Sequence, residues 1–217
     1  MLKICEILYR RPGMSVEDFQ SHWLGTHGPI VARIPGIRRY VQSHPKLGGY
    51  RKGDLICDGV AEIWVDDKNA LKAMTTTAEF AAAKRDEPNF IDGDRLVELL
   101  TSETVIKDGP IPKGGVKSIS LLKYKIGMDP AAAAAHWRDK HGPIVLGIEQ
   151  LRRYVQCPVR LGAYRKPTPP VIDGLPMAWF ASVADMRESA ASEAYARTKA
   201  DEINFLEPGR IGRILTV

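Results

Sequence analysis

The chain has 217 residues, of which 44% are hydrophobic and 26% are charged, and its formal net charge is +5. This composition is ordinary for a globular protein, and the mild charge without a long basic run argues against a nucleic-acid-binding protein. No apolar stretch approaches the ~18 residues that span a bilayer, and the N-terminus has no signal-peptide pattern. Three cysteines form neither a disulfide framework nor a zinc spacing. We therefore expect a cytoplasmic protein that binds neither nucleic acid nor membrane.

Nearly the whole chain consists of one unit that occurs twice. The offset between the copies is 114 residues at first and 115 in the second half of the unit. A period this long indicates tandem domains rather than a solenoid, whose repeats have ~20–50 residues. We predict domain 1 at 1–103, a linker at 104–115 and domain 2 at 116–217. The repeated segments are HWLGTHGPIV (22–31) with HWRDKHGPIV (136–145), RRYVQ (38–42 and 152–156) and DEPNF (86–90) with DEINF (201–205).

The first predicted elements of each domain are a strand and a helix. In domain 1 the strand covers 2–9, and Ser15 then opens the helix as N-cap, with Asp18 three residues later. Domain 2 uses Asp129 as the cap, followed by a proline at the first helical position. The segment Gly28-Pro29 should interrupt the first helix, because a residue before proline avoids the α region.

The pattern then predicts two more strands, a second helix and a last strand, which in domain 1 cover 37–42, 60–65, 70–85 and 95–101. The order βαββαβ is the ferredoxin-like arrangement, an antiparallel sheet with both helices on one face. The second strand has no purely polar face, since simple alternation places Ile37 with Arg39, on the side opposite Tyr40. Both sheet faces should therefore be covered, and we expect the sheets of the two copies to pair.

The motifs reached so far resemble the EthD family in both copies. They are FQSHW at 19–23, HGP at 27–29, Asp58-Gly59 before Trp64, and DExNF at 86–90. The resemblance implies two ferredoxin-like units whose sheets form a dimeric α+β barrel, here within one chain. Similar domains act as dehydratases, decarboxylases or cyclases in polyketide pathways, and a related lactone isomerase shares the barrel.

The second copy departs from the first at two positions of interest. Phe19 is replaced by Ala133, and the acidic Glu62 by Met177. If Glu62 matters chemically, the second copy has lost its activity.

The candidate chemistry is centred on one histidine in each copy. His27 and His141 each follow a tryptophan by four residues, which extends the inward face of the first helix. Desolvation can lower the pKa of such a histidine, so that it serves as a general base near neutral pH. The catalytic candidates are His27, His141, Tyr40 and Tyr154. The substrate-binding candidates are Gln42, Gln156, Trp23, Trp137, Trp64 and Trp179.

Each of these candidates also has a structural interpretation. A histidine just before Gly-Pro can cap a broken helix, and tryptophans at these positions can simply fill the core. His22 and His136 are expected on the flank of the helix, as surface residues. His22 and His27 are five residues apart, about 140° on a continuous helix, whereas zinc-binding helices use a spacing of four. We therefore expect no metal and no cofactor.

The leading hypothesis is a cofactor-free acid–base lyase or isomerase that acts on an oxygenated or aromatic small molecule by dehydration, isomerisation or decarboxylation. The alternative is a non-catalytic binding or accessory protein of a degradation pathway. A third hypothesis is a haem protein, since other dimeric α+β barrels bind haem through a histidine. The fused chain could be a monomer or a homodimer.

Overall fold

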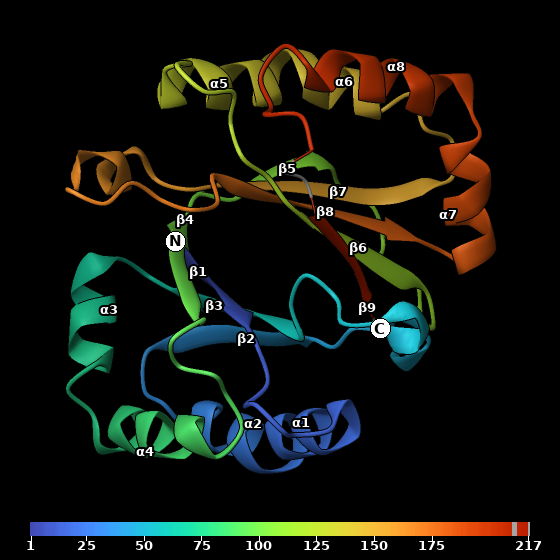
Figure 1. Cartoon of the computed structure of the whole chain (residues 1–217). Coiled ribbons are helices and arrows are strands. Elements are labelled where there is room, and N and C mark those ends of the chain that lie inside the picture. Colours follow the sequence, from blue (N-terminus) through green and yellow to red (C-terminus); the bar gives the residue numbers. More distant parts are fainter. Residues whose placement is uncertain (210–211, 217) are drawn as a thin grey trace. The chain divides into compact units, whose positions relative to one another are not determined.

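The computed structural model describes residues 1–209 and 212–216. It divides into two compact units, Met1–Thr101 (unit 1) and Ser102–Val217 (unit 2). Each unit has one antiparallel sheet with its main helices on one face (Figure 1). The prediction of two tandem ferredoxin-like units is confirmed, whereas the pairing of the two sheets stays a prediction.

Unit 1 has a four-stranded sheet in the order β2-β3-β1-β4, which is the ferredoxin-like order. The chain order of its elements is β1 (Leu2–Leu8), α1 (Val16–His22), a π-helical turn (Trp23–His27), α2 (Gly28–Val31), β2 (Ile37–Ser43), a 3₁₀ turn (Leu47–Lys52), β3 (Gly59–Val65), α3 (Lys68–Met74), α4 (Ala78–Asp86), a 3₁₀ turn (Glu87–Asn89) and β4 (Val97–Thr101).

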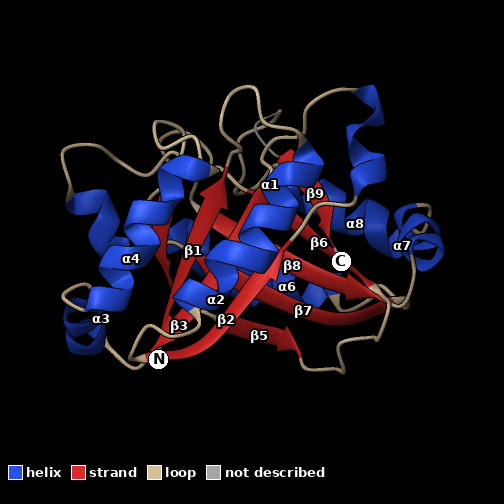
Figure 2. Ribbon diagram, turned by 90° about the horizontal axis from the view of Figure 1, so that it is seen from below, coloured by secondary structure: helices blue, strands red, loops and turns tan. Residues whose placement is uncertain are grey.

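Unit 2 repeats this order and adds an edge strand, so that its sheet runs β5-β7-β8-β6-β9 (Figure 2). The added strand β5 lies at the start of the segment expected to be a linker. The chain order is β5 (Thr104–Lys107), β6 (Val116–Leu121), α5 (Pro130–His136), a π-helical turn (Trp137–His141), α6 (Gly142–Val145), β7 (Leu151–Pro158), a 3₁₀ turn (Leu161–Arg165), β8 (Gly174–Phe180), α7 (Val183–Ala190), α8 (Glu193–Glu202) and β9 (Gly212–Thr216).

The helix caps are confirmed, but the predicted break at Gly28-Pro29 is wrong. Ser15 accepts a hydrogen bond from the N–H of Asp18, and the chain then stays helical through Val31. The reason is the π-helical turn Trp23–His27, which shifts the hydrogen bonds by one residue. Pro29 consequently falls where an α-helix restarts, a position at which its missing N–H is not needed.

Two further expectations about unit 1 are wrong. The helix predicted at 70–85 is two helices, because Thr77 ends the first segment and caps the second by accepting from the N–H of Phe80. A β-bulge between Ile37 and Arg39 breaks the simple alternation of β2. The extra residue moves Ile37 to the helix-facing side, where it packs with Tyr40.

Two findings bear on the remaining sequence-based expectations. The cysteines are buried and form no disulfide among the described residues. In residues 1–209 and 212–216, every helix is too short or too polar to serve as a membrane span.

Candidate functional site

Each unit holds two histidines on a single carboxylate. In unit 1 the Nε2–H of His22 and the Nδ1–H of His27 both donate to Asp86, each at 3.0 Å. The side-chain amide of Asn89 donates to the same carboxylate at 3.0 Å. Unit 2 repeats the arrangement with the same histidine-to-carboxylate distances, between His136, His141, Asp201 and Asn204. We call each set the histidine–aspartate cluster of its unit.

The π-helical turn brings the two histidines of each cluster together. On a continuous α-helix, residues five apart would lie about 140° from each other. The wider turn carries more residues, so His27 comes round to the side of His22 and both reach Asp86. His22 and His136, expected on the flank of the helix as surface residues, are instead half-buried and share a carboxylate with His27 and His141.

The cluster fixes the protonation of the inner histidine. A carboxylate can only accept, so the Nδ1 atom of His141 carries the hydrogen and the Nε2 atom of the neutral ring has a lone pair. Among the described residues, that Nε2 atom has no hydrogen-bond partner. Burial lowers the pKa of His141 below 6.5, and Asp201 offsets only part of this effect. The ring is thus held neutral at pH 7, as a general base requires.

The carboxylate itself stays ionised. Burial alone would raise the pKa of Asp201, but hydrogen bonds from Asn204 and the two histidines outweigh it and lower the pKa. The same holds for Asp86 of unit 1, with Asn89 in the place of Asn204. A carboxylate behind a histidine ring both orients the ring and stabilises the imidazolium that forms when the ring takes a proton.

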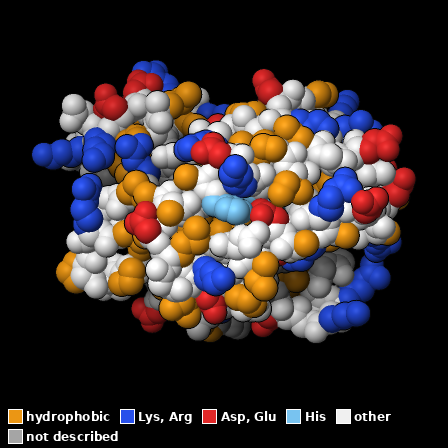
Figure 3. Space-filling model, turned by 90° about the horizontal axis from the view of Figure 1, so that it is seen from above, with side chains coloured by type: hydrophobic (Ala, Val, Ile, Leu, Met, Phe, Trp, Pro, Cys, Tyr) orange, Lys and Arg blue, Asp and Glu red, His pale blue; other side chains and the backbone are white. Residues whose placement is uncertain are grey.

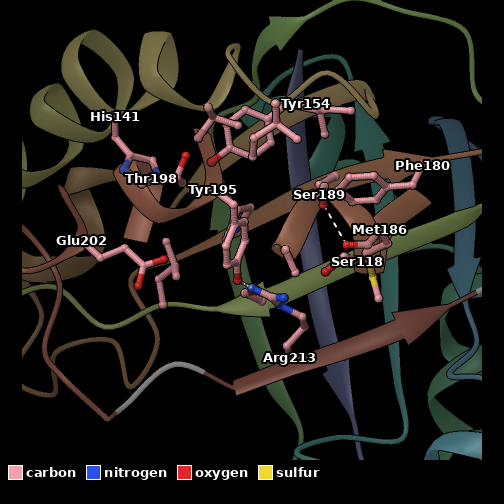
Figure 4. Close-up of a pocket in the computed structure, with 18 of the residues that line it drawn as sticks. Ser118, His141, Tyr154, Phe180, Met186, Ser189, Tyr195, Thr198, Glu202 and Arg213 are labelled. Carbon is pink, nitrogen blue, oxygen red and sulfur yellow. Dashed lines mark hydrogen bonds between the residues drawn. The ribbon is translucent and has the colours of Figure 1, made fainter. Parts of the chain in front are cut away.

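Unit 2 has a cavity of about 160 Å³ between its helices and its sheet. His141 and Tyr154 both line it (Figure 4). Trp137 of the π-helical turn is also part of the lining. The remaining wall is mixed, with apolar side chains such as Phe180 beside several hydroxyl groups. The volume is close to that of a cavity that holds one benzene ring, about 150 Å³. This cavity can therefore enclose a ligand the size of a single six-membered ring.

The cavity exists because unit 2 has smaller side chains at equivalent positions. Its lining includes Ser118, Ala178 and Ser189. The repeat aligns these residues with Ile4, Ile63 and Met74 of unit 1, which pack in the apolar core between the helices and the sheet. At these three equivalent positions unit 1 has large apolar side chains and unit 2 has small ones, all of which line the same cavity.

The predicted tyrosines lie on the helix-facing side of each sheet, next to the predicted tryptophans. The indole Nε1–H of Trp137 donates to the hydroxyl of Tyr154 at 3.2 Å, and that of Trp23 donates to Tyr40 at 3.0 Å. Burial raises the pKa of Tyr154 to about 12, so the hydroxyl keeps its proton. Its oxygen accepts from the indole, and a hydroxyl group that accepts one hydrogen bond still has its O–H to donate.

The predicted glutamines hold the π-helical turns rather than the cavity. Gln42 and Gln156 each donate from Nε2 to the carbonyl oxygen of the tryptophan that begins the turn, at 2.9 and 2.8 Å. That carbonyl also accepts the N–H of the glycine five residues later. Gln42 additionally donates to the hydroxyl of Tyr40 at 3.0 Å. These glutamines therefore stabilise the π-helical turns that carry the inner histidines.

The structure does not bring Trp64 and Trp179 together with the histidines. In β3 the neighbour Ile63 faces the helices, so Trp64 faces the opposite side of the sheet. There the Nζ atom of Lys3 lies 4.5 Å from the ring centroid of Trp64, and it also forms a buried ion pair with Glu62 at 2.8 Å. In unit 2, Lys117 lies 5.0 Å from the centroid of Trp179.

Sequence reasoning missed several residues of the site. Asp86 and Asp201 gave a signal only as the first residue of the DExNF motif, which is repeated in both copies, as the histidines are. Arg213, which lines the cavity, gave no signal because its counterpart in the first copy is Glu98. The small residues of the cavity could have been found only by comparing the two copies position by position.

The surface over α5, α6 and α8 shows a histidine next to an acidic side chain, with basic and acidic groups interspersed around them (Figure 3). The side chain of His136 is 23% exposed, whereas that of His141 is 6% exposed. Only the inner histidine is thus enclosed with the cavity. Within residues 1–209 and 212–216, no group of three or more His, Cys, Asp or Glu side chains is arranged to hold a metal ion.

A family comparison agrees with the repeat. The model of the EthD domain matches residues 11–94 and 125–209, one match in each unit. The chain belongs to the EthD domain family. Both matched segments of this EthD protein contain the histidine–aspartate cluster of their unit. None of the curated proteins matches the chain.

Solved structures share the fold of this EthD protein across its whole length. An anthrone oxidase-like protein superposes with a TM-score of 0.69 and 8% identity, over 99% of this chain and 90% of that one. A proposed monooxygenase from Fusobacterium nucleatum gives 0.63 and 10%, over 99% and 90%. Another from Lactobacillus acidophilus gives 0.60 and 9%, over 100% and 92%. Such low identities establish the fold and carry no activity across.

Proposed function

We propose that this EthD protein is a cofactor-free acid–base enzyme, a lyase or isomerase that acts on a ring-sized small molecule in the cavity of unit 2. The observation that carries the proposal is that His141 and Tyr154 line one cavity, with Asp201 behind the histidine. A base, a hydroxyl donor and an orienting carboxylate are the groups that proton abstraction next to a carbonyl needs.

The proposed chemistry gives each of these groups one role. The Nε2 atom of His141 takes a proton from the carbon next to the carbonyl, and Asp201 stabilises the imidazolium. Negative charge develops on the carbonyl oxygen, where the O–H of Tyr154 donates a hydrogen bond. The proton can return to another carbon, which is isomerisation. Alternatively the enolate can expel a β-hydroxyl group, which takes the proton from the His141 imidazolium and leaves as water; this is dehydration.

Deuterium exchange tests this proposal without knowledge of the natural substrate. Cyclohexanone has the size of one ring, and near neutral pH its α-protons exchange for deuterium only slowly unless a catalyst removes one of them. We expect the protein in D₂O to accelerate this exchange, as followed by NMR. The variant His141→Asn should lower the acceleration by about 10²–10⁴-fold, the usual contribution of a general base.

The repeat supplies the matched control, because His27→Asn makes the same substitution at the equivalent position of unit 1. That variant should keep its exchange rate within about twofold. Exchange that is absent in the wild type, or unchanged in His141→Asn, would contradict the proposal. The alternative, a non-catalytic binding protein that uses the same cavity, predicts that cyclohexanone binds without exchange.

A further inference from the structure

An arginine lies at the cavity of unit 2 without an acidic partner. Arg213 of β9 points toward Tyr195 of α8, whereas His141 descends from the helix layer (Figure 4). Its Nη2–H donates to the hydroxyl of Tyr195 at 3.2 Å, and its Nε–H approaches Ser120 at 3.4 Å. Within the described part of the chain, no carboxylate forms an ion pair with it. Both of its partners are neutral hydroxyl groups, so no carboxylate compensates the charge of this exposed residue.

Unit 1 has the opposite charge at the same place in the fold. Ser120 pairs with Arg213 in the sheet of unit 2, and the equivalent pair in unit 1 is Glu6 with Glu98. Burial, Glu98 and Glu87 together raise the pKa of Glu6 to about 7, which reflects how poorly this place accepts a second negative charge. A hydroxyl and a cation in one copy thus replace two carboxylates in the other.

Two other charged groups line the cavity of unit 2. Arg187 of α7 is a second arginine, with its side chain largely exposed. Glu202 of α8 is an acid, but it forms an ion pair with Lys199, which compensates its charge. The balance at the cavity therefore favours a ligand that carries a negative charge.

We propose that Arg213 binds the carboxylate of a small aromatic substrate whose ring occupies the cavity of unit 2. The proposal rests on the function proposed above, since it gives the substrate class of that site. A guanidinium presents five N–H donors in a planar fork, and with two bound by hydroxyls it keeps donors for a carboxylate. The volume of about 160 Å³ accepts one ring, and Ser120 and Tyr195 hold the fork in place.

Three ligands of the same shape and different charge separate the effect of charge on binding from the effect of shape. Benzoate, benzamide and benzamidine have the same ring and a planar substituent that is negative, neutral or positive at pH 7. We expect the wild-type protein to bind benzoate at least about tenfold more tightly than benzamide, as measured by titration calorimetry at low salt. Benzamidine should bind most weakly. Benzoate binding that is undetectable, or no tighter than benzamide binding, would overturn the proposal.

Variants of Arg213 then assign the preference to this side chain. Arg213→Gln should bring benzoate to within about twofold of benzamide and leave the affinity for benzamide unchanged. Arg213→Glu, which copies Glu98 of unit 1, should reverse the preference so that benzamidine binds more tightly than benzoate. The control Arg152→Gln, at an exposed position of β7, should keep the wild-type order. A preference that survives in both Arg213 variants would overturn the assignment.

The substrate class and the function can fail separately. His141→Asn should stop deuterium exchange but keep the ratio of benzoate to benzamide affinity. If exchange is independent of His141 while Arg213 still controls that ratio, the cavity binds anions without acid–base catalysis. If exchange needs His141 but the ratio of benzoate to benzamide affinity does not change in the Arg213 variants, the enzyme acts on a neutral substrate.

Discussion

The two units share a framework and differ in what lies beneath it. Each has a π-helical turn, a histidine–aspartate cluster and a tryptophan that donates to a tyrosine hydroxyl. In unit 1 this framework covers an apolar core that includes Ile63 and Met74. In unit 2 it covers a cavity. The framework is thus common to both units, whereas the small residues beneath it accompany a cavity in unit 2.

The comparison also bears on Glu62. The second copy was expected to have lost its activity only if Glu62 takes part in the chemistry. Glu62 faces away from the histidines, where it pairs with Lys3, so its replacement by Met177 does not touch the cavity. The differences that matter lie on the helix-facing side, at Ser118, Ala178 and Ser189.

Filling the cavity should have the largest effect. The double variant Ala178→Ile, Ser189→Met gives unit 2 the side chains of Ile63 and Met74. We expect the cavity to close, and both exchange of cyclohexanone and binding of benzoate to fall by at least about 100-fold with little change in thermal stability, since added apolar contacts offset added crowding. NMR exchange and calorimetry measure the two losses. The exposed substitution Ala184→Ile on α7 is the control and should retain both.

The reverse change should destabilise unit 1. Ile63→Ala copies Ala178 and removes buried methyl groups from the apolar core of unit 1. We expect a loss of about 2–5 kcal/mol in the free energy of unfolding, measured with denaturant. A loss below about 1 kcal/mol would mean that this side of unit 1 is loosely packed and that the contrast between the units is overstated.

Removing the carboxylate behind each histidine should have an intermediate effect. Asp201→Asn no longer fixes the ring tautomer or stabilises the imidazolium, so exchange should fall about 10- to 100-fold. In the wild type, exchange should decline only as pH falls below 6.5, because burial lowers the pKa of His141 and the base stays neutral above that pKa. Exchange rates from pH 5 to 9 test both statements. Asp86→Asn, the equivalent change in unit 1, should leave the rate and its pH profile unchanged.

The smallest effect concerns the carboxylate that unit 2 lacks. The pKa of Glu6 is raised from 4.5 to about 7, so the folded state binds this proton more tightly than the unfolded state. Stability from this group is present below pH 4.5 and is lost as pH rises to about 7. Glu6→Gln should therefore stabilise the protein by about 1–3 kcal/mol at pH 8 and by almost nothing near pH 4.5. Denaturant unfolding at both pH values measures this increase, and Glu149→Gln, at an exposed position, is the control. An increase in the free energy of unfolding that is the same at both pH values would contradict the prediction.

The sequence predicted the tandem fold because its signals are local and repeated. Ser15 and Asp129 open their helices through hydrogen bonds to residues three positions later, which is a local signal. A repeat of this length indicates two domains from the sequence alone. Gly28-Pro29 was misread because the usual rule for proline assumes an α-helix. The π-helical turn that removes the conflict has no sequence signature of its own.

The candidate site was predicted in part. His141, Tyr154 and Trp137 do line one cavity, since helical and strand periodicity places them on facing surfaces. The carboxylate of Asp201 and the cation of Arg213 come from the second half of the unit, and only the tertiary fold brings them to the first half. Single-sequence periodicity carries no information about such contacts.

The central claim is that a ligand reaches the histidine of unit 2 and not that of unit 1. Nitrogen NMR of the imidazole rings tests it directly, because the chain has only 5 histidines and their assignment by substitution is simple. On titration with cyclohexanone, the Nε2 signal of His141 should shift while that of His27 stays fixed. A shift at His27, or no shift at either ring, would contradict the account.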